Sequence, residues 1–346
     1  MKLFIARLLS GICLYILLGL SIESSVLSNT ILAMGYRSLL IFSPLFCALF
    51  RSHSLSISFL FVLIAVGFYF FKMEIIGSVL AALGLSIGGF LIKKVAAESA
   101  SSAGLNKIAL SLANIVAGLS LTITDNNYSQ GLLIAAAMML ISLVMIKAQK
   151  TEPVINESIL PKGGLNSLWH QDLGWLLIGC SIGIRIFGLY AVLPWYLTHK
   201  LGDLPAWYGT LLMIYGALVI LVQFPAVSKK MHVSLRTALF ALGLSFIVIA
   251  VPELFSVELF WGGVLWVSLL AAEEMFAPFI DFHASSSNKL LLKEFSISLG
   301  GGLCVLMMRL IELPYLVAGS GLLLMCVGYL LVHDKTRQLN LKAVEK

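Results

Sequence analysis

Long apolar stretches alternate with short polar ones along the chain. A helix needs about 20 residues to cross the roughly 30 Å of hydrocarbon in a bilayer, so apolar windows of about that length predict membrane-spanning helices. Twelve such windows follow one another, at residues 5–28, 34–50, 55–71, 75–92, 108–124, 130–146, 173–198, 206–227, 237–252, 257–280, 295–312 and 314–332. This pattern predicts an all-α polytopic membrane protein with twelve transmembrane helices.

The most polar internal stretch, residues 148–172, separates the windows into two sets of six. We therefore predict an N-terminal six-helix bundle over 1–147, a cytoplasmic central linker over 148–172, and a C-terminal six-helix bundle with a short cytoplasmic tail over 173–346. Two sets of equal size indicate a pseudo-symmetric architecture.

Composition supports a membrane environment. Hydrophobic residues make up 60% of the chain and charged residues 12%, whereas about 25% of an average soluble domain is charged. The net charge of +6 comes from short basic runs between apolar windows, so we expect the lipid bilayer, and not nucleic acid, to be the partner of this charge.

The distribution of Lys and Arg predicts the orientation. With both termini in the cytoplasm, 18 of the 23 basic residues lie on the cytoplasmic side, and Arg185 and Arg309 lie deeper within windows. Only Arg37, Lys72 and Lys200 lie on the opposite side of the membrane. We expect an integral membrane protein that acts as a monomer. The compact loops are typical of a bacterial inner membrane protein.

The clearest candidate for chemistry is Arg185, about thirteen residues into a window of about twenty-five. A guanidinium cannot lose its charge at this depth, so it needs an acid or an anion in a wet pathway. Candidate acids lie at compatible depths in the first and tenth windows, at Glu23, Glu273 and Glu274. Because consecutive helical residues point about 100° apart, we expect only one of Glu273 and Glu274 to face Arg185.

These charges have two interpretations. In the functional one, Arg185 binds a negative group of a substrate, and Glu23, Glu273 or Glu274 carries a coupling proton, because a desolvated carboxyl can retain a proton. In the structural one, a permanent ion pair fixes two helices together.

Uncharged polar residues supply further candidates for substrate binding. Asn114 lies on a polar stripe of the fifth window, which either lines a pore or hydrogen-bonds a neighbouring helix. Tyr215 and Gln223 lie deep on one face of the eighth window. No metal or other cofactor is expected, since the six histidines lie in loops or near helix ends and the five cysteines lack metal-binding spacing.

The topology resembles the major facilitator superfamily: two six-helix bundles, a cytoplasmic central loop and basic loops after the second and eighth helices. These loops are Arg51-Ser52-His53-Ser54 and Ser228-Lys229-Lys230-Met231-His232, and both lack the Gly and Asp of the family signature. The resemblance implies alternating access around a site lined by the first, fourth, seventh and tenth helices. Glu23, Arg185 and Glu273 or Glu274 lie on three of these four.

The sequence thus predicts a secondary active transporter, not an enzyme, that moves a small anionic or zwitterionic organic solute with coupling to protons. Two alternatives stay open. One is a membrane-embedded transferase for lipid or cell-wall precursors, with Asp281 and His283 near His232 as its best polar set. The other is a non-transporting receptor or assembly factor with a transporter fold.

Overall fold

The computed structural model describes residues 2–24, 26–124, 127–147, 169–203, 205, 207–228, 233–311 and 313–344. Most of the predicted linker lies outside this range, as does His232. The backbone of Glu23 is described, but its side chain lies outside the described part.

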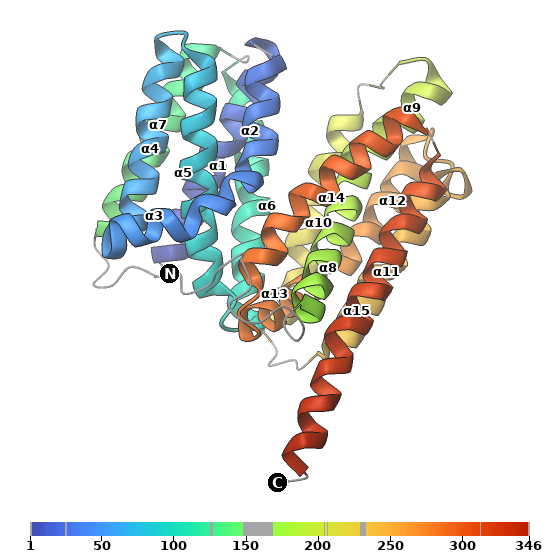
Figure 1. The fold of residues 1–346 in the computed structure, drawn as a ribbon. Helices are drawn as coiled ribbons and strands as arrows, with labels where there is room; N and C mark the ends of the chain where they lie inside the picture. The colour runs from blue at the N-terminus through green and yellow to red at the C-terminus, as the bar shows by residue number, and fades with distance from the viewer. Residues whose placement is uncertain are drawn as a thin grey trace. The chain divides into compact units, whose positions relative to one another are not determined.

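The N-terminal half is helical in all its longer described segments (Figure 1). Its helices are α1 (Lys2–Ser24), α2 (Val26–Ser38), η1 (Leu39–Phe42), α3 (Ser43–Phe50), η2 (Arg51–His53), α4 (Ser54–Phe70), α5 (Glu74–Ala96), α6 (Ala100–Ile123) and α7 (Tyr128–Lys147). The predicted second window therefore falls on an interrupted stretch of α2, η1 and α3, with Pro44 at the start of α3.

The C-terminal half is also helical and has more interruptions. Its helices are α8 (Trp169–Phe187), the π-helical η3 (Gly188–Val192), α9 (Leu193–Leu201), α10 (Tyr208–Ser228), α11 (Leu235–Ala250), η4 (Pro252–Phe255), α12 (Phe260–Glu273), η5 (Glu274–Phe276), α13 (Ala277–Ser286), α14 (Leu290–Leu310) and α15 (Pro314–Val344). Each predicted window overlaps helical residues.

The chain divides into two compact units. The first comprises Met1–Glu157 and Val219–Lys230, and the second comprises Ser158–Leu218 and Met231–Lys346. The end of α10 thus groups with the first unit, and the predicted bundle boundaries at 147 and 173 stay a prediction.

Both units share a packing scheme. In the first unit α1 packs on α6 and α7, and α4 runs alongside α5 (Figure 1). In the second unit α8 packs on α14 and α15, and α11 packs on α15, α12 and α13. The first helix of each set of six therefore packs against the last two helices of that set, as expected for a pseudo-symmetric pair.

Glycines allow the close approach of α8 and α14. A Cβ atom at Gly183 would collide with the carbonyl of Ile297, and a Cβ atom at Gly300 would collide with the backbone of Cys180. Small residues at such crossings permit backbone contact between membrane helices. This contact fixes α8 within one turn of Arg185.

The surface of the helices is apolar enough for a bilayer. Eight helical stretches of the described residues are long and apolar enough to cross a membrane. Bulky side chains such as Phe240 and Ile247 of α11 are exposed, which suits contact with lipid. The all-α polytopic class is confirmed, and the count of twelve spans stays a prediction.

Candidate functional site

Arg185 lies next to a break in its helix. It is two residues before the end of α8, and the π-helical segment Gly188–Val192 follows. Pro194 then stands in the first turn of α9, where its ring removes one backbone hydrogen bond of a continuous helix. Short π-helical segments often occur at functional sites in helices.

A second break carries the two acids. Glu273 ends α12, and Glu274 begins the tight turn of η5, before Pro278 in the first turn of α13. Because Pro278 has no N–H, it cannot donate to the carbonyl of Glu274 four residues earlier. The cation and its partner therefore both stand at interrupted helices within the second unit.

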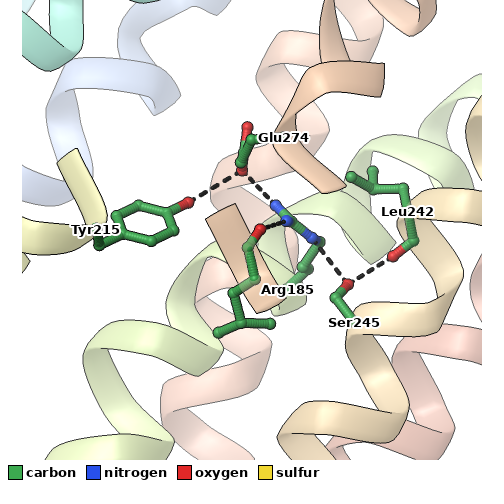
Figure 2. A network of polar contacts seen from close by, with 6 residues as sticks. Arg185, Tyr215, Leu242, Ser245 and Glu274 are labelled. Carbon is green, nitrogen blue, oxygen red and sulfur yellow. Dashed lines mark hydrogen bonds and ion pairs between the residues drawn. The ribbon is translucent and has the colours of Figure 1, made fainter. Parts of the chain in front are cut away.

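These breaks bring Arg185 and Glu274 into a buried ion pair (Figure 2). Arg185 is 4% exposed and Glu274 is 2% exposed. The Nη1 group of Arg185 donates to Oε1 of Glu274, and the same oxygen accepts a hydrogen bond of 3.1 Å from the hydroxyl of Tyr215 on α10. The carboxylate thus lies between a cation and a phenol.

The remaining donors of the guanidinium point to α11 and α12. Nε donates to the hydroxyl of Ser245 at 2.8 Å, and Nη2 donates to the carbonyl of Leu270 at 2.9 Å. The Ser245 hydroxyl in turn donates to the carbonyl of Leu242 (Figure 2). The charge is therefore neutralised and hydrogen-bonded, as a buried ion pair requires.

Glu273 lies in the same electrostatic field but in a different position. It interacts with Arg185 through charge and lies beside Ser245. Its Oε2 atom is buried without a hydrogen-bond partner among the described residues. We expected only one of the two acids to face Arg185. Glu274 pairs with Arg185 directly, and Glu273 interacts with the charge of Arg185 without an ion pair among the described contacts.

The structure gathers some predicted site residues and separates others. Arg185, Glu274 and Tyr215 form one network. Asn114 is a partly buried residue of α6 in the first unit, and Gln223 is a buried residue in the part of α10 that groups with that unit. The roles of these two residues, and of Glu23, stay predictions.

Sequence reasoning missed two contributors to this network, Ser245 and the carbonyl of Leu270. Serine is common in membrane helices and no carbonyl is distinguishable by sequence. Ser245 could have been identified only if the ninth predicted helix had been known to lie beside the seventh.

A second buried charge cluster lies where α13 meets α14. Lys293, which is 2% exposed, pairs with Asp281 and with the adjacent Glu294. The eleventh window is predicted to begin at residue 295, whereas α14 begins at Leu290, so Lys293 lies on the helix. Nearby, Lys289 pairs with Asp172 of α8.

The polar set considered for a transferase is engaged in these contacts. Asp281 pairs with Lys293, and the Nε2 group of His283 lies 3.0 Å from the carbonyl oxygen of Val233. In the part of the chain that the structure describes, no three His, Cys, Asp or Glu side chains are grouped to hold a metal ion.

No family model and no curated protein sequence matches the chain. Solved structures do match over nearly its full length. They include FucP, a major facilitator superfamily transporter in an outward conformation, with a TM-score of 0.65, 13% identity, and coverage of 95% of this chain and 98% of that one. A variant of the E. coli fucose:proton symporter FucP matches with a TM-score of 0.68, 12% identity and 96% coverage of both chains.

The human organic anion transporter MFSD10 (TETRAN) also matches, with a TM-score of 0.65, 11% identity, and coverage of 96% of this chain and 98% of that one. These likenesses, together with the apolar helices, define an integral membrane protein. The chain has the fold of major facilitator superfamily transporters, as the sequence predicted.

Proposed function

We propose that the protein is a secondary active transporter that moves a small anionic or zwitterionic organic solute by alternating access, with coupling to protons. The fold is that of transporters, and the similar structures include a fucose:proton symporter and an organic anion transporter. The two bundles, 1–147 and 173–346, would rock about the solute site.

The observation that carries this proposal is the Arg185–Glu274 pair at two broken helices. Interrupted membrane helices tend to mark binding sites, because their free backbone groups are tolerated where a cavity forms. A buried ion pair is also a weak source of net stability, so its presence at two broken helices favours a functional role.

The pair suggests a mechanism of exchange. A proton that binds to Glu274 cancels its charge and leaves the guanidinium of Arg185 without a counter-ion. An anionic group of the solute then takes the place of the carboxylate on Arg185. When Glu274 loses its proton, it regains Arg185 and displaces the solute.

The other candidates have subsidiary roles in this proposal. Tyr215 donates to the carboxylate of Glu274 and would donate to the solute once that carboxylate is protonated. Asn114 and Gln223 contribute further polar contacts to the solute. Glu23 and Glu273 are further proton carriers, and Glu273 is the stronger of the two because its Oε2 atom is buried without a hydrogen-bond partner among the described residues.

We further propose that the protein is a monomer in a bacterial inner membrane with both termini in the cytoplasm. This orientation rests on the basic loops.

Proton-coupled flux in proteoliposomes tests the proposal. A pH-sensitive dye inside the vesicles would report proton entry as labelled monocarboxylates, dicarboxylates and amino acids are added in turn. We expect one class to drive proton entry in the wild type. Arg185→Ala should abolish both binding and flux, and Glu274→Gln should retain solute exchange but lose its response to a pH gradient.

Glu253→Gln is the matched control, because Glu253 is an exposed acid of η4. It should behave as the wild type does. Gradient-driven flux that survives Glu274→Gln unchanged would contradict the exchange mechanism. An Arg185–Glu274 pair that only fixes helices would give variants that unfold more readily, yet transport normally when folded.

A further inference from the structure

A second buried arginine lies in the first unit, in the second turn of α1. Arg7 is 5% exposed, although it lies near the start of the predicted window 5–28, where a long basic side chain can extend towards water. Lys2, one turn earlier, is exposed. Arg7 thus differs from the ordinary basic residues that surround membrane helices, because its head group does not extend into water.

The neighbours of the guanidinium are neutral. Nη2 of Arg7 donates to the hydroxyl of Tyr36 on α2 at 3.1 Å. Nη1 lies against Gly89 of α5, where a Cβ atom would collide with it. Nε is buried and has no hydrogen-bond acceptor among the described residues, and no carboxylate of the described residues pairs with Arg7.

Such a charge needs a counter-ion. A guanidinium stays protonated in proteins, and an unpaired charge that is removed from water is costly. The Nε–H group and a neighbouring Nη–H group form a fork that matches two oxygens of a carboxylate or a phosphate. The free Nε–H of Arg7 leaves this fork open to a ligand.

We propose that Arg7, whose guanidinium lies against Gly89 and donates to the hydroxyl of Tyr36, is a binding site for an anionic oxygen group, a carboxylate or a phosphate. Tyr36 is only partly buried, so the guanidinium lies one side chain away from the surface of the unit. The anion comes either from a free solute or from the headgroup of an anionic lipid. The proposal goes beyond the solute contact assigned to Arg185 and does not depend on it.

Thermal unfolding of the purified protein in detergent tests this site. Sodium phosphate, sodium acetate and phosphatidylglycerol would be titrated separately, with sodium chloride at matched ionic strength as the reference. We expect a saturable rise in Tm with at least one of these probes, because a ligand that binds only the folded state stabilises it. A response to phosphate or acetate identifies a free anion, and a response to phosphatidylglycerol alone identifies a lipid headgroup.

Three variants connect the response to this site. Arg7→Met should abolish it, Tyr36→Phe should weaken it, and Gly89→Ala should weaken it by displacing the guanidinium. Gly67→Ala is the control, since a Cβ atom at Gly67 meets nothing within 4 Å. If Arg7→Met does not fold, Tyr36→Phe and Gly89→Ala still test whether the rise in Tm depends on this site.

The proposal is overturned if no probe raises the Tm of the wild type, or if the rise is the same in Arg7→Met or, where that variant does not fold, in both Tyr36→Phe and Gly89→Ala. Its failure is distinguishable from that of the proposed function. An anion that binds at Arg7 without any flux in proteoliposomes would remove only the transport proposal, and coupled flux with no Arg7-dependent binding would remove only this one.

Discussion

Among the described side chains, each compact unit buries one arginine, and the two arginines have different partners. Arg185 is 4% exposed, and its guanidinium donates to a carboxylate, a serine hydroxyl and a backbone carbonyl. Arg7 is 5% exposed, and its guanidinium donates to the phenol of Tyr36. The two arginines are therefore almost equally buried, but Arg185 has more hydrogen-bond acceptors than Arg7, and one of them is a carboxylate.

The difference in partners determines how readily each buried arginine can bind an anionic ligand. The second unit supplies its own counter-ion in Glu274, so an anion can reach Arg185 only after that carboxylate is neutralised or displaced. The first unit supplies no such acid to Arg7 among the described residues, so an anion can bind there without competition. The first arrangement suits coupling to protons, and the second suits simple binding.

Removal of Glu274 should have the largest effect on stability. Glu274→Ala leaves Arg185 buried without a counter-ion, which should lower the free energy of unfolding by about 3–5 kcal/mol. Denaturation in detergent measures this loss, with the exposed Glu253→Ala as a control expected within about 0.5 kcal/mol of the wild type. Equal stability of the two variants would show that the ion pair does not hold the second unit together.

Substitutions at the contact between α8 and α14, beside Arg185, should have the next largest effect on stability. Gly300→Ala introduces a Cβ atom that collides with the backbone of Cys180, and overpacking of this kind costs about 1–3 kcal/mol. Gly89→Ala should cost less, because its obstacle is the flexible end of Arg7. The same denaturation assay compares them with Gly319→Ala, where the space is open. If Gly300→Ala were as stable as Gly319→Ala, the close approach of α8 and α14 would be disproved.

The smallest expected change in the free energy of unfolding is an increase and not a loss. Arg7→Met removes an uncompensated charge, so in a buffer without carboxylate or phosphate the free energy of unfolding should stay the same or rise by about 1 kcal/mol. Arg185→Met should instead lower it, because Glu274 then stays buried without its cation. Equal losses in the two variants would mean that Arg7 has a partner as strong as Glu274.

Much of this architecture could be predicted from the sequence. Apolar windows and basic loops are enough to predict the helices, because a bilayer imposes a fixed length on them. Charge and depth alone indicated Arg185 and, as its candidate partners, Glu23, Glu273 and Glu274, because an ionisable group within a membrane is costly and needs a partner. Tyr215 was found by its depth and face.

The sequence was less informative about features that depend on contacts between helices, such as which side chains are buried and where a helix is interrupted. The sequence did not identify Arg7 and Lys293 as buried charges, since a long side chain near the end of a helix can point either to water or to its neighbours. Ser245 and the carbonyl of Leu270 became recognisable only once α11 and α12 were placed beside α8. The breaks at Gly188–Val192 and Glu274–Phe276 depend on packing as well as on Pro194 and Pro278.

Accessibility at the ion pair tests the central claim most directly. Ser245→Cys, in a background without the five native cysteines, places a thiol beside the guanidinium of Arg185. We predict that a membrane-impermeant thiol reagent modifies this position from either side of a sealed vesicle, and that the Glu274→Gln substitution changes the ratio of the two rates. A thiol that is shielded from both sides under all solute and pH conditions would contradict alternating access to Arg185.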